Sequence, residues 1–277
     1  MSLFIIDEKK CRKDGICAAE CPLGLIMLGR DGACPQPVAG AERLCINCGH
    51  CMAVCPYGAF SLKRMDCEEC PPLQRDLLPS AGQVRQMVRA RRSIRLYQDK
   101  IIGQEVLAEL IDTARYAPTG RNSQQLGWLV INDPLEVNRL AGLAIDWMGQ
   151  MIKDDNPMVK GYGMTSLVKA WEQGKDPILR HAPALLLVHA PSDYRIARID
   201  ASIALASLEL TAFAGGLGTC WAGFFDTAVN NWPALQRDLD FGVGRSLFGA
   251  MMIGYPKYCY HRLPLRDEPQ VTWRGAS

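Results

Sequence analysis

The sequence has almost no excess charge of either sign. Its 277 residues carry 31 Lys and Arg against 29 Asp and Glu, a formal net charge of +2. This balance gives no indication of a nucleic acid or a membrane surface as partner. The most apolar stretch, residues 196–225, is interrupted by Arg198, Asp200 and Glu209, which favours a buried helix over a membrane span. The length is sufficient for two domains.

Other signals are also missing. The N-terminal residues, 1–8, lack a basic start followed by a long apolar run, so we expect no signal peptide. No Gly-x-Gly-x-x-Gly run follows a predicted strand. None of the four histidines has an acidic partner in the sequence, so we assign no general base. No internal repeat or low-complexity tract is present apart from the cysteine runs described next.

Cysteine is the residue in excess. Ten of the twelve cysteines precede residue 71. Their C-x2-C spacing indicates metal binding rather than a disulfide framework, and reduced thiols predict a cytoplasmic protein.

The densest cysteine run is Cys45-Ile-Asn-Cys48-Gly-His-Cys51-Met-Ala-Val-Cys55, followed by Pro56. A structural zinc site also uses C-x2-C pairs. Four cysteines within eleven residues, ending in Cys-Pro, favour an iron–sulfur cluster. In this spacing the first three thiolates bind one cluster, and the fourth reaches a second one.

An upstream run, residues 11–22, has the same register, but Asp14 stands where the second cysteine is expected. We therefore predict one [4Fe–4S] cluster with the ligands Cys21, Cys45, Cys48 and Cys51. A second cluster would have the ligands Cys11, Asp14, Cys17 and Cys55. Because a carboxylate is a harder ligand than a thiolate, we expect either an Asp-ligated [4Fe–4S] or a [3Fe–4S] cluster there. Residues 1–65 resemble a two-cluster bacterial ferredoxin.

The remaining early cysteines have no evident ligand set. Cys34, Cys67 and Cys70 could bind metal, but we favour spare thiols because no partner pair lies nearby. Prolines follow Cys70 closely, so we interpret residues 66–80 as a linker between the ferredoxin-like domain and a second domain at 81–277.

Arginines are concentrated just after the linker. Ser80 is predicted to cap a helix, with apolar residues at helical spacing on one face. Five arginines without an acidic residue among them follow or line the other face, at positions 85, 89, 91, 92 and 95. They indicate either a solvated helix face or an anion site, because guanidinium groups bind phosphate bidentately. Charge alone does not decide between the two.

The segments that follow form an ordered set. After Arg91-Arg-Ser-Ile-Arg95 come a helix ending Arg115-Tyr-Ala-Pro118, the loop Asn122-Ser-Gln124 and an apolar strand. Later landmarks are a strand at 182–189, a long apolar helix, Gly216-Leu-Gly-Thr-Cys-Trp-Ala-Gly223 and Gly254-Tyr-Pro-Lys257. From about residue 81 to the end this order resembles the FMN-dependent nitroreductase family. The resemblance implies an α+β protein whose second domain is a three-layer α/β/α domain with a central, mostly antiparallel sheet.

The resemblance also implies a homodimer with FMN at the interface, bound by both chains. It assigns flavin-binding roles to Arg91, Arg92, Ser93, Arg95, Pro118, Thr119, Asn122, Gln124, Trp221, Ala222, Gly223, Arg262 and Arg266. Arginines of the first motif would meet the phosphate and the flavin's N1–O2 edge, and the amides of Asn122 and Gln124 would come from the partner chain. Many members carry an acidic residue where this chain has Gly223, which leaves the contact with flavin N5 to a backbone N–H.

The two resemblances together imply an FMN-dependent iron–sulfur oxidoreductase. The flavin supplies the chemistry, so no protein side chain is predicted as a nucleophile. The acceptor could be a nitroaromatic, a quinone or a similar organic molecule, and the donor an external ferredoxin or NAD(P)H. Three alternatives remain. The chain could be an electron-transfer module for a protein partner, it could perform flavin fragmentation or reductive dehalogenation, or its clusters could only stabilise a small domain.

Overall fold

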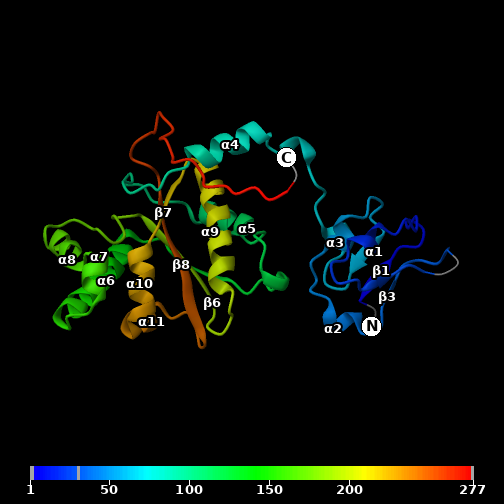
Figure 1. Ribbon diagram of the computed structural model, residues 1–277, viewed down its shortest axis with the longest axis horizontal. Helices are drawn as coiled ribbons and strands as arrows, with labels where there is room; N and C mark the ends of the chain where they lie inside the picture. The colour runs from blue at the N-terminus through cyan, green and yellow to red at the C-terminus, as the bar shows by residue number, and fades with distance from the viewer. Residues whose placement is uncertain (1–2, 30–31, 276–277) are drawn as a thin grey trace. The chain divides into compact units, whose positions relative to one another are not determined.

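The computed structural model describes residues 3–29 and 32–275, and it divides into two compact units (Figure 1). Unit 1 comprises the described residues up to Leu78 together with Thr119–Ser123. Unit 2 comprises Pro79–Pro118 and the described residues from Gln124 onward. The boundary between Leu78 and Pro79 lies within the predicted linker 66–80. Each unit has its own buried core and is described by itself.

Unit 1 is built on short elements. Strand β1 (Phe4–Ile6) pairs antiparallel with β4 (Phe60–Leu62), and β2 (Ile26–Met27) pairs with β3 (Gln36–Pro37). The rings of Phe4 and Phe60 pack with centroids 4.5 Å apart. Three helices complete the unit: α1 (Ile16–Glu20), α2 (Ala41–Leu44) and α3 (His50–Ala53). The core of unit 1 is small and buries little apolar surface. Bonds to a metal cluster would therefore add substantially to the stability of the unit.

The two cysteine runs of unit 1 have matching backbones. Helices α1 and α3 both begin after a glycine with φ of 76°, Gly15 and Gly49. Two residues before each glycine, Lys13 and Asn47 have φ of 58° and 52°, a conformation that is uncommon for residues other than glycine. Asp14 therefore occupies the same place in its loop as Cys48 does in the other.

The start of the predicted linker packs on unit 1. The short 3₁₀ helix η2 (Cys67–Glu69) is held by a hydrogen bond from the Cys67 thiol to the Gly58 carbonyl, at 3.2 Å. Lys10 forms an ion pair with Glu68 at 2.6 Å. A second 3₁₀ helix, η3 (Arg75–Leu77), lies entirely at the surface. Within residues 66–80, Cys67 and Cys70 are half-buried, whereas residues 71–80 are all exposed.

Unit 2 is organised around one sheet of four strands: β5 (Gly127–Ile131), β6 (Ala184–Pro191), β7 (Gly218–Trp221) and β8 (Arg245–Gly254). Their order is β5-β6-β8-β7, and every pair is antiparallel. Successive side chains of β6 alternate between two cores, because residues of a strand point to opposite faces. Leu185 and Leu187 belong to one core, and Leu186 and Val188 to the other.

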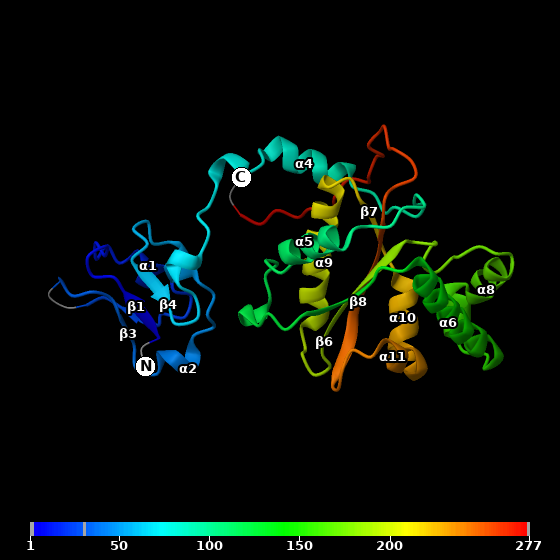
Figure 2. The same cartoon turned by 180° about the vertical axis from the view of Figure 1, so that it is seen from behind.

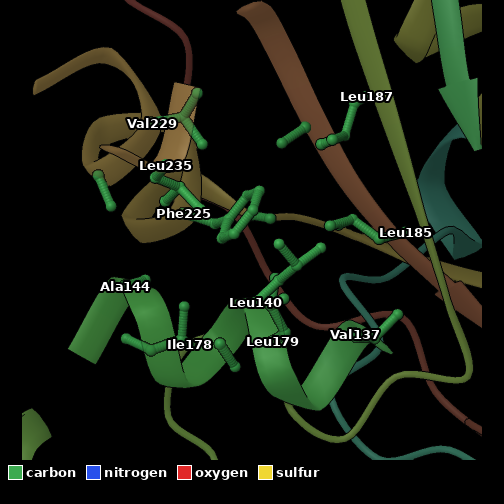
Figure 3. Close-up of a cluster of buried hydrophobic side chains, with 14 of the residues drawn as sticks. Val137, Leu140, Ala144, Ile178, Leu179, Leu185, Leu187, Phe225, Val229 and Leu235 are labelled. Atoms are coloured by element: carbon green, nitrogen blue, oxygen red, sulfur yellow. The ribbon is translucent and has the colours of Figure 1, made fainter. Parts of the chain in front are cut away.

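Helices cover both faces of this sheet, as Figures 1 and 2 show. On one side α5 (Gln104–Ala114) and α9 (Ala197–Ala214) pack on each other, and α9 packs on β6 and β8. On the other side lie α6 (Pro134–Lys153), α7 (Met158–Tyr162), α8 (Met164–Glu172), α10 (Gly223–Asn231) and α11 (Pro233–Leu239). Figure 3 shows Leu140 of α6 and Phe225 of α10 packed beside Leu185 and Leu187. The predicted three-layer α/β/α architecture is confirmed.

Helix α4 (Ala81–Ala90) begins at the predicted cap. The Ser80 hydroxyl accepts the Gln83 N–H at 3.3 Å, and the Gln83 side chain accepts the Ser80 N–H at 2.8 Å. This reciprocal pair is a capping box. At the other end of α4 the C-cap residue is Arg91, so the arginines of residues 91–95 follow directly after the last turn.

The predicted buried helix within residues 196–225 is α9, which carries the buried carboxylates Asp200 and Glu209. Within residues 3–29 and 32–275 no helix combines the length and apolarity needed to cross a membrane. None of the twelve cysteines forms a disulfide bond.

Candidate functional site

The first site is a cavity in unit 1 that gathers four cysteines. Cys45, Cys48 and Cys51 approach it from the second cysteine run, and Cys21 comes from the first. The rest of its lining is largely apolar and includes Leu25 and Ile26. This is the ligand grouping that the sequence predicts for the first cluster.

Backbone amides point at the sulfurs of this cavity. The Leu25 N–H donates to Cys21 Sγ at 3.3 Å, and the Asn47 N–H donates to Cys45 Sγ at 3.4 Å. Burial raises the pKa of the Cys51 thiol to about 12, so a bound iron must displace its proton before the sulfur becomes a ligand. Four thiols with N–H donors around one apolar cavity fit a [4Fe–4S] cluster.

A second cavity of unit 1 is lined by Cys11, Asp14, Cys17 and Cys55. The Ala59 N–H lies 3.5 Å from Cys55 Sγ, and burial raises the pKa of the Cys17 thiol. The Asp14 carboxylate accepts the Ile16 N–H at 3.2 Å, at the start of α1. Asp14 thus has a backbone partner at the start of the helix that follows it. Three thiols and one carboxylate fit either of the two predicted forms of the second cluster.

Cys34 lies beside this second cavity. Desolvation raises the pKa of its thiol, and a hydrogen bond with the Cys11 thiol raises it further. Cys34 was interpreted from the sequence as a spare thiol, and that interpretation did not predict its contact with Cys11.

The third site is in unit 2, where the segment after α4 runs beside β7. The Ile94 N–H donates to the Thr219 carbonyl at 2.8 Å, and Ser93 forms an isolated parallel bridge with Thr219. This pairing presents a cavity of about 290 Å³. Its lining consists of five of the predicted flavin residues, namely Arg91, Arg92, Ser93, Arg95 and Arg266.

Only one of these arginines is neutralised. Arg91 Nη1 lies 3.0 Å from Glu209 Oε1, and the buried Glu209 also accepts the Thr219 hydroxyl at 3.1 Å. Arg92, Arg95 and Arg266 have no carboxylate within 4.0 Å among the described residues. The cavity therefore carries excess positive charge in the planar, multidonor form that binds phosphate.

A larger hollow of about 370 Å³ shares Arg91 and Arg92 with the arginine cavity. Apolar and aromatic side chains line much of it, among them Phe213, Leu217 and Tyr258. A charged end next to an apolar hollow suits an amphipathic cofactor, with a phosphate at one end and a ring system at the other. The residues present therefore fit FMN.

The other predicted flavin residues lie outside the arginine cavity. Trp221 and Ala222 end strand β7 and lead into α10, which starts at Gly223. The Ala222 N–H donates to the Ala250 carbonyl at 2.9 Å, so this N–H already has an acceptor within the protein. Arg262 is exposed and does not line the cavity. Pro118, Thr119, Asn122 and Gln124 also do not line it, and Thr119 and Asn122 belong to unit 1.

Two residues of this site were missed by the sequence analysis. Glu209 was seen only as an interruption of an apolar stretch, although a lone acid on a buried helix face requires a partner. Arg180 is half-buried with φ of 61°. Together with Arg95 it lowers the pKa of the Cys220 thiol against the larger, opposing effect of burial. No sequence signal marks Arg180.

Comparison with known proteins gives matches in both parts of the chain. Residues 88–255 match the model of the nitroreductase family, and residues 42–61 match the model of the 4Fe-4S binding domain. A similar protein is the "Putative NADH dehydrogenase/NAD(P)H nitroreductase" of Archaeoglobus fulgidus, 26% identical over 171 residues, which are 62% of this chain and 84% of that protein.

Two solved structures share the fold. A nitroreductase with bound FMN from Desulfitobacterium hafniense DCB-2 has a TM-score of 0.58 at 18% identity, covering 71% of this chain and 100% of that one. A nitroreductase with bound FMN from Bacteroides fragilis NCTC 9343 has a TM-score of 0.51 at 21% identity, covering 69% and 95%. Since the family match spans more than half of the sequence, the chain belongs to the nitroreductase family, with a 4Fe-4S binding motif near its N-terminus.

Proposed function

We propose that this protein is an FMN-dependent oxidoreductase in which two iron–sulfur clusters and a flavin exchange electrons, and that it reduces an organic acceptor such as a nitroaromatic or a quinone. When bound, the flavin supplies hydride chemistry and the clusters supply one-electron transfer. The observation that carries the proposal is a cavity with three arginines that form no ion pair with a carboxylate of the described residues. The other unit of the chain gathers cysteines around two cavities.

The chain's own residues have distinct parts in this proposal. Arg92, Arg95 and Arg266 hold the FMN phosphate, because no carboxylate in the described residues neutralises them. Arg91 is oriented by Glu209 and keeps a fixed position at the cavity wall. Positive charge near the flavin would favour its anionic reduced form. The remaining predicted contacts, at residues 118–124 and 221–223, stay predictions.

A homodimer is part of the same proposal. Helix α9 buries one face, with Ala201, Leu205 and Leu208, and exposes isoleucines on the other. Ile199 is 60% exposed and Ile203 36% exposed. A long helix with an uncovered apolar stripe commonly marks an interface. A second copy of the chain would cover this stripe and complete a flavin site to which one chain contributes only part of the predicted contacts.

The test begins with binding. The purified protein, reconstituted anaerobically with iron, sulfide and FMN, should retain both cofactors through gel filtration and elute as a dimer. R95A and R266A should each weaken FMN binding about 10- to 100-fold, because each removes a charge-assisted hydrogen bond worth about 1.5–3 kcal/mol. R85A is the matched control, since Arg85 lies on exposed α4 and lines none of these cavities.

The electron donor is tested in the same preparation. Rapid loss of flavin absorbance on mixing with NADH or NADPH would identify nicotinamide as the donor. Reduction only by a reduced ferredoxin would place electron entry at the clusters. Failure to retain FMN, or equal FMN affinity in wild type, R95A and R266A, would refute the proposed function.

A further inference from the structure

The side chain of Asn122 forms hydrogen bonds with the loop between Cys45 and Cys48, two predicted ligands of the first cluster. Asn122 belongs to the segment Thr119–Ser123, which is part of unit 1. Its carboxamide nitrogen, Nδ2, donates to the Ile46 carbonyl at 3.1 Å and to the Asn47 carbonyl at 3.0 Å. Ile46 and Asn47 are the two residues between Cys45 and Cys48.

The first of these bonds acts on a peptide group that also contacts a cluster ligand. The Ile46 carbonyl and the Asn47 N–H belong to the same peptide unit, and that N–H donates to Cys45 Sγ at 3.4 Å. In a planar trans peptide the carbonyl and the N–H point in opposite directions. Holding the carbonyl on Asn122 therefore aims the N–H at the sulfur.

The backbone on both sides of this contact is unusual. Asn47 has φ of 52° and Asn122 has φ of 53°. Such left-handed conformations cost free energy for residues other than glycine and persist only when the surroundings hold them. Two hydrogen bonds from one carboxamide contribute to holding this loop. The equivalent loop of the second cluster has Lys13 in place of Asn47 and no hydrogen bond from Asn122.

We propose that Asn122 is a positioning residue for the first cluster: it orients the Ile46–Asn47 peptide so that its N–H donates to the thiolate of Cys45. This inference rests on the proposed binding of a cluster by Cys21, Cys45, Cys48 and Cys51. Hydrogen bonds to ligand sulfurs stabilise the more negative, reduced state of an iron–sulfur cluster and so raise its potential. Loss of the Asn122 amide should make the first cluster harder to reduce and leave the second one unchanged.

The experiment is a redox titration of the reconstituted full-length protein, followed by electron paramagnetic resonance. We expect N122A to shift the midpoint potential of the first cluster to a more negative value. N122D should shift it at least as far, because a carboxylate cannot donate to the two carbonyls. The second cluster in the same sample is the internal control. N132A is the matched control, because Asn132 Nδ2 likewise donates to a backbone carbonyl, that of Ile102, at 2.8 Å within unit 2.

The outcomes separate the two hypotheses. A first-cluster potential in N122A and N122D equal to that of the wild type, or an equal shift of both clusters, would overturn the role of Asn122. Loss of the first cluster alone from N122A, with the second retained, would support it. Absence of a first-cluster signal from the wild-type protein would instead defeat the proposed cluster itself, whatever the variants show.

Discussion

The ion pair between Arg91 and Glu209 makes a prediction that can be worked out from its burial. Glu209 has 7% of its side chain exposed and Arg91 has 28%, and their charged atoms are 3.0 Å apart. The substitution Glu209→Gln keeps the size of the side chain and one acceptor oxygen but removes the charge. Arg91 would then remain largely buried without a counter-charge.

The expected loss of stability follows from these exposures. Removing one partner of a fully buried pair costs about 3–5 kcal/mol, whereas an exposed pair contributes about 0–1 kcal/mol. Arg91 is partly exposed and glutamine keeps a neutral hydrogen bond, so we expect E209Q to lower the free energy of unfolding by about 2 kcal/mol. For a domain of this size that loss corresponds to a melting temperature lower by about 4–8 °C.

Tryptophan fluorescence is the suitable assay, because all six tryptophans follow residue 80 and so report on unit 2. Thermal unfolding of FMN-free wild type, E209Q, R91M and the double variant completes a double-mutant cycle. Each single variant leaves the other charge unpaired, so the double variant should lose less stability than the sum. We expect a coupling energy of about 1–2 kcal/mol.

The reasoning would be refuted by a coupling energy below about 0.5 kcal/mol, the usual scatter for independent sites. The T219V variant serves as a control, because it removes only the hydroxyl that donates to Glu209. A loss in T219V as large as that in E209Q would mean that the hydroxyl contact, rather than the ion pair, stabilises this region.

Three further predictions concern the second cluster, the pH dependence and the close packing beside the arginine cavity. The variant D14C should give the second cluster site four thiolates, so its iron should resist a chelator longer than that of the wild type; an unchanged rate of iron loss would contradict the assignment of Asp14. Burial lowers the pKa of His189, so below about pH 6.5 the unfolded chain binds a proton that the folded chain excludes, and stability should fall as the pH drops through that range. The variant H189N should lack this dependence in a series of melting temperatures. A Cβ added at Gly218 would lie 2.4 Å from Ile94 Cγ1, so G218A should destabilise unit 2 by about 1–3 kcal/mol and weaken FMN binding. The control G149A adds a methyl group in open space within α6 and should be neutral or slightly stabilising by melting temperature.

The sequence alone predicted the features that depend on local spacing. The cysteine intervals, with glycines at the turns, determine how each loop wraps, because a few consecutive residues set that geometry. The register of the two runs predicted that Asp14 would occupy the position of Cys48, and both loops have the same backbone conformation. The ordered landmarks after residue 81 predicted the three-layer fold only through their resemblance to the nitroreductase family.

Contacts between distant segments were decided only by the tertiary structure. Arg91 and Glu209 are 118 residues apart, and Asn122 lies 76 residues from Ile46. No local periodicity relates such residues, because their meeting depends on how whole elements pack. The same holds for Arg266, which joins the arginines that follow α4. The sequence by itself therefore determined which chemical groups this protein carries, whereas packing decided which arginines remain unpaired and which amide holds the Cys45–Cys48 loop.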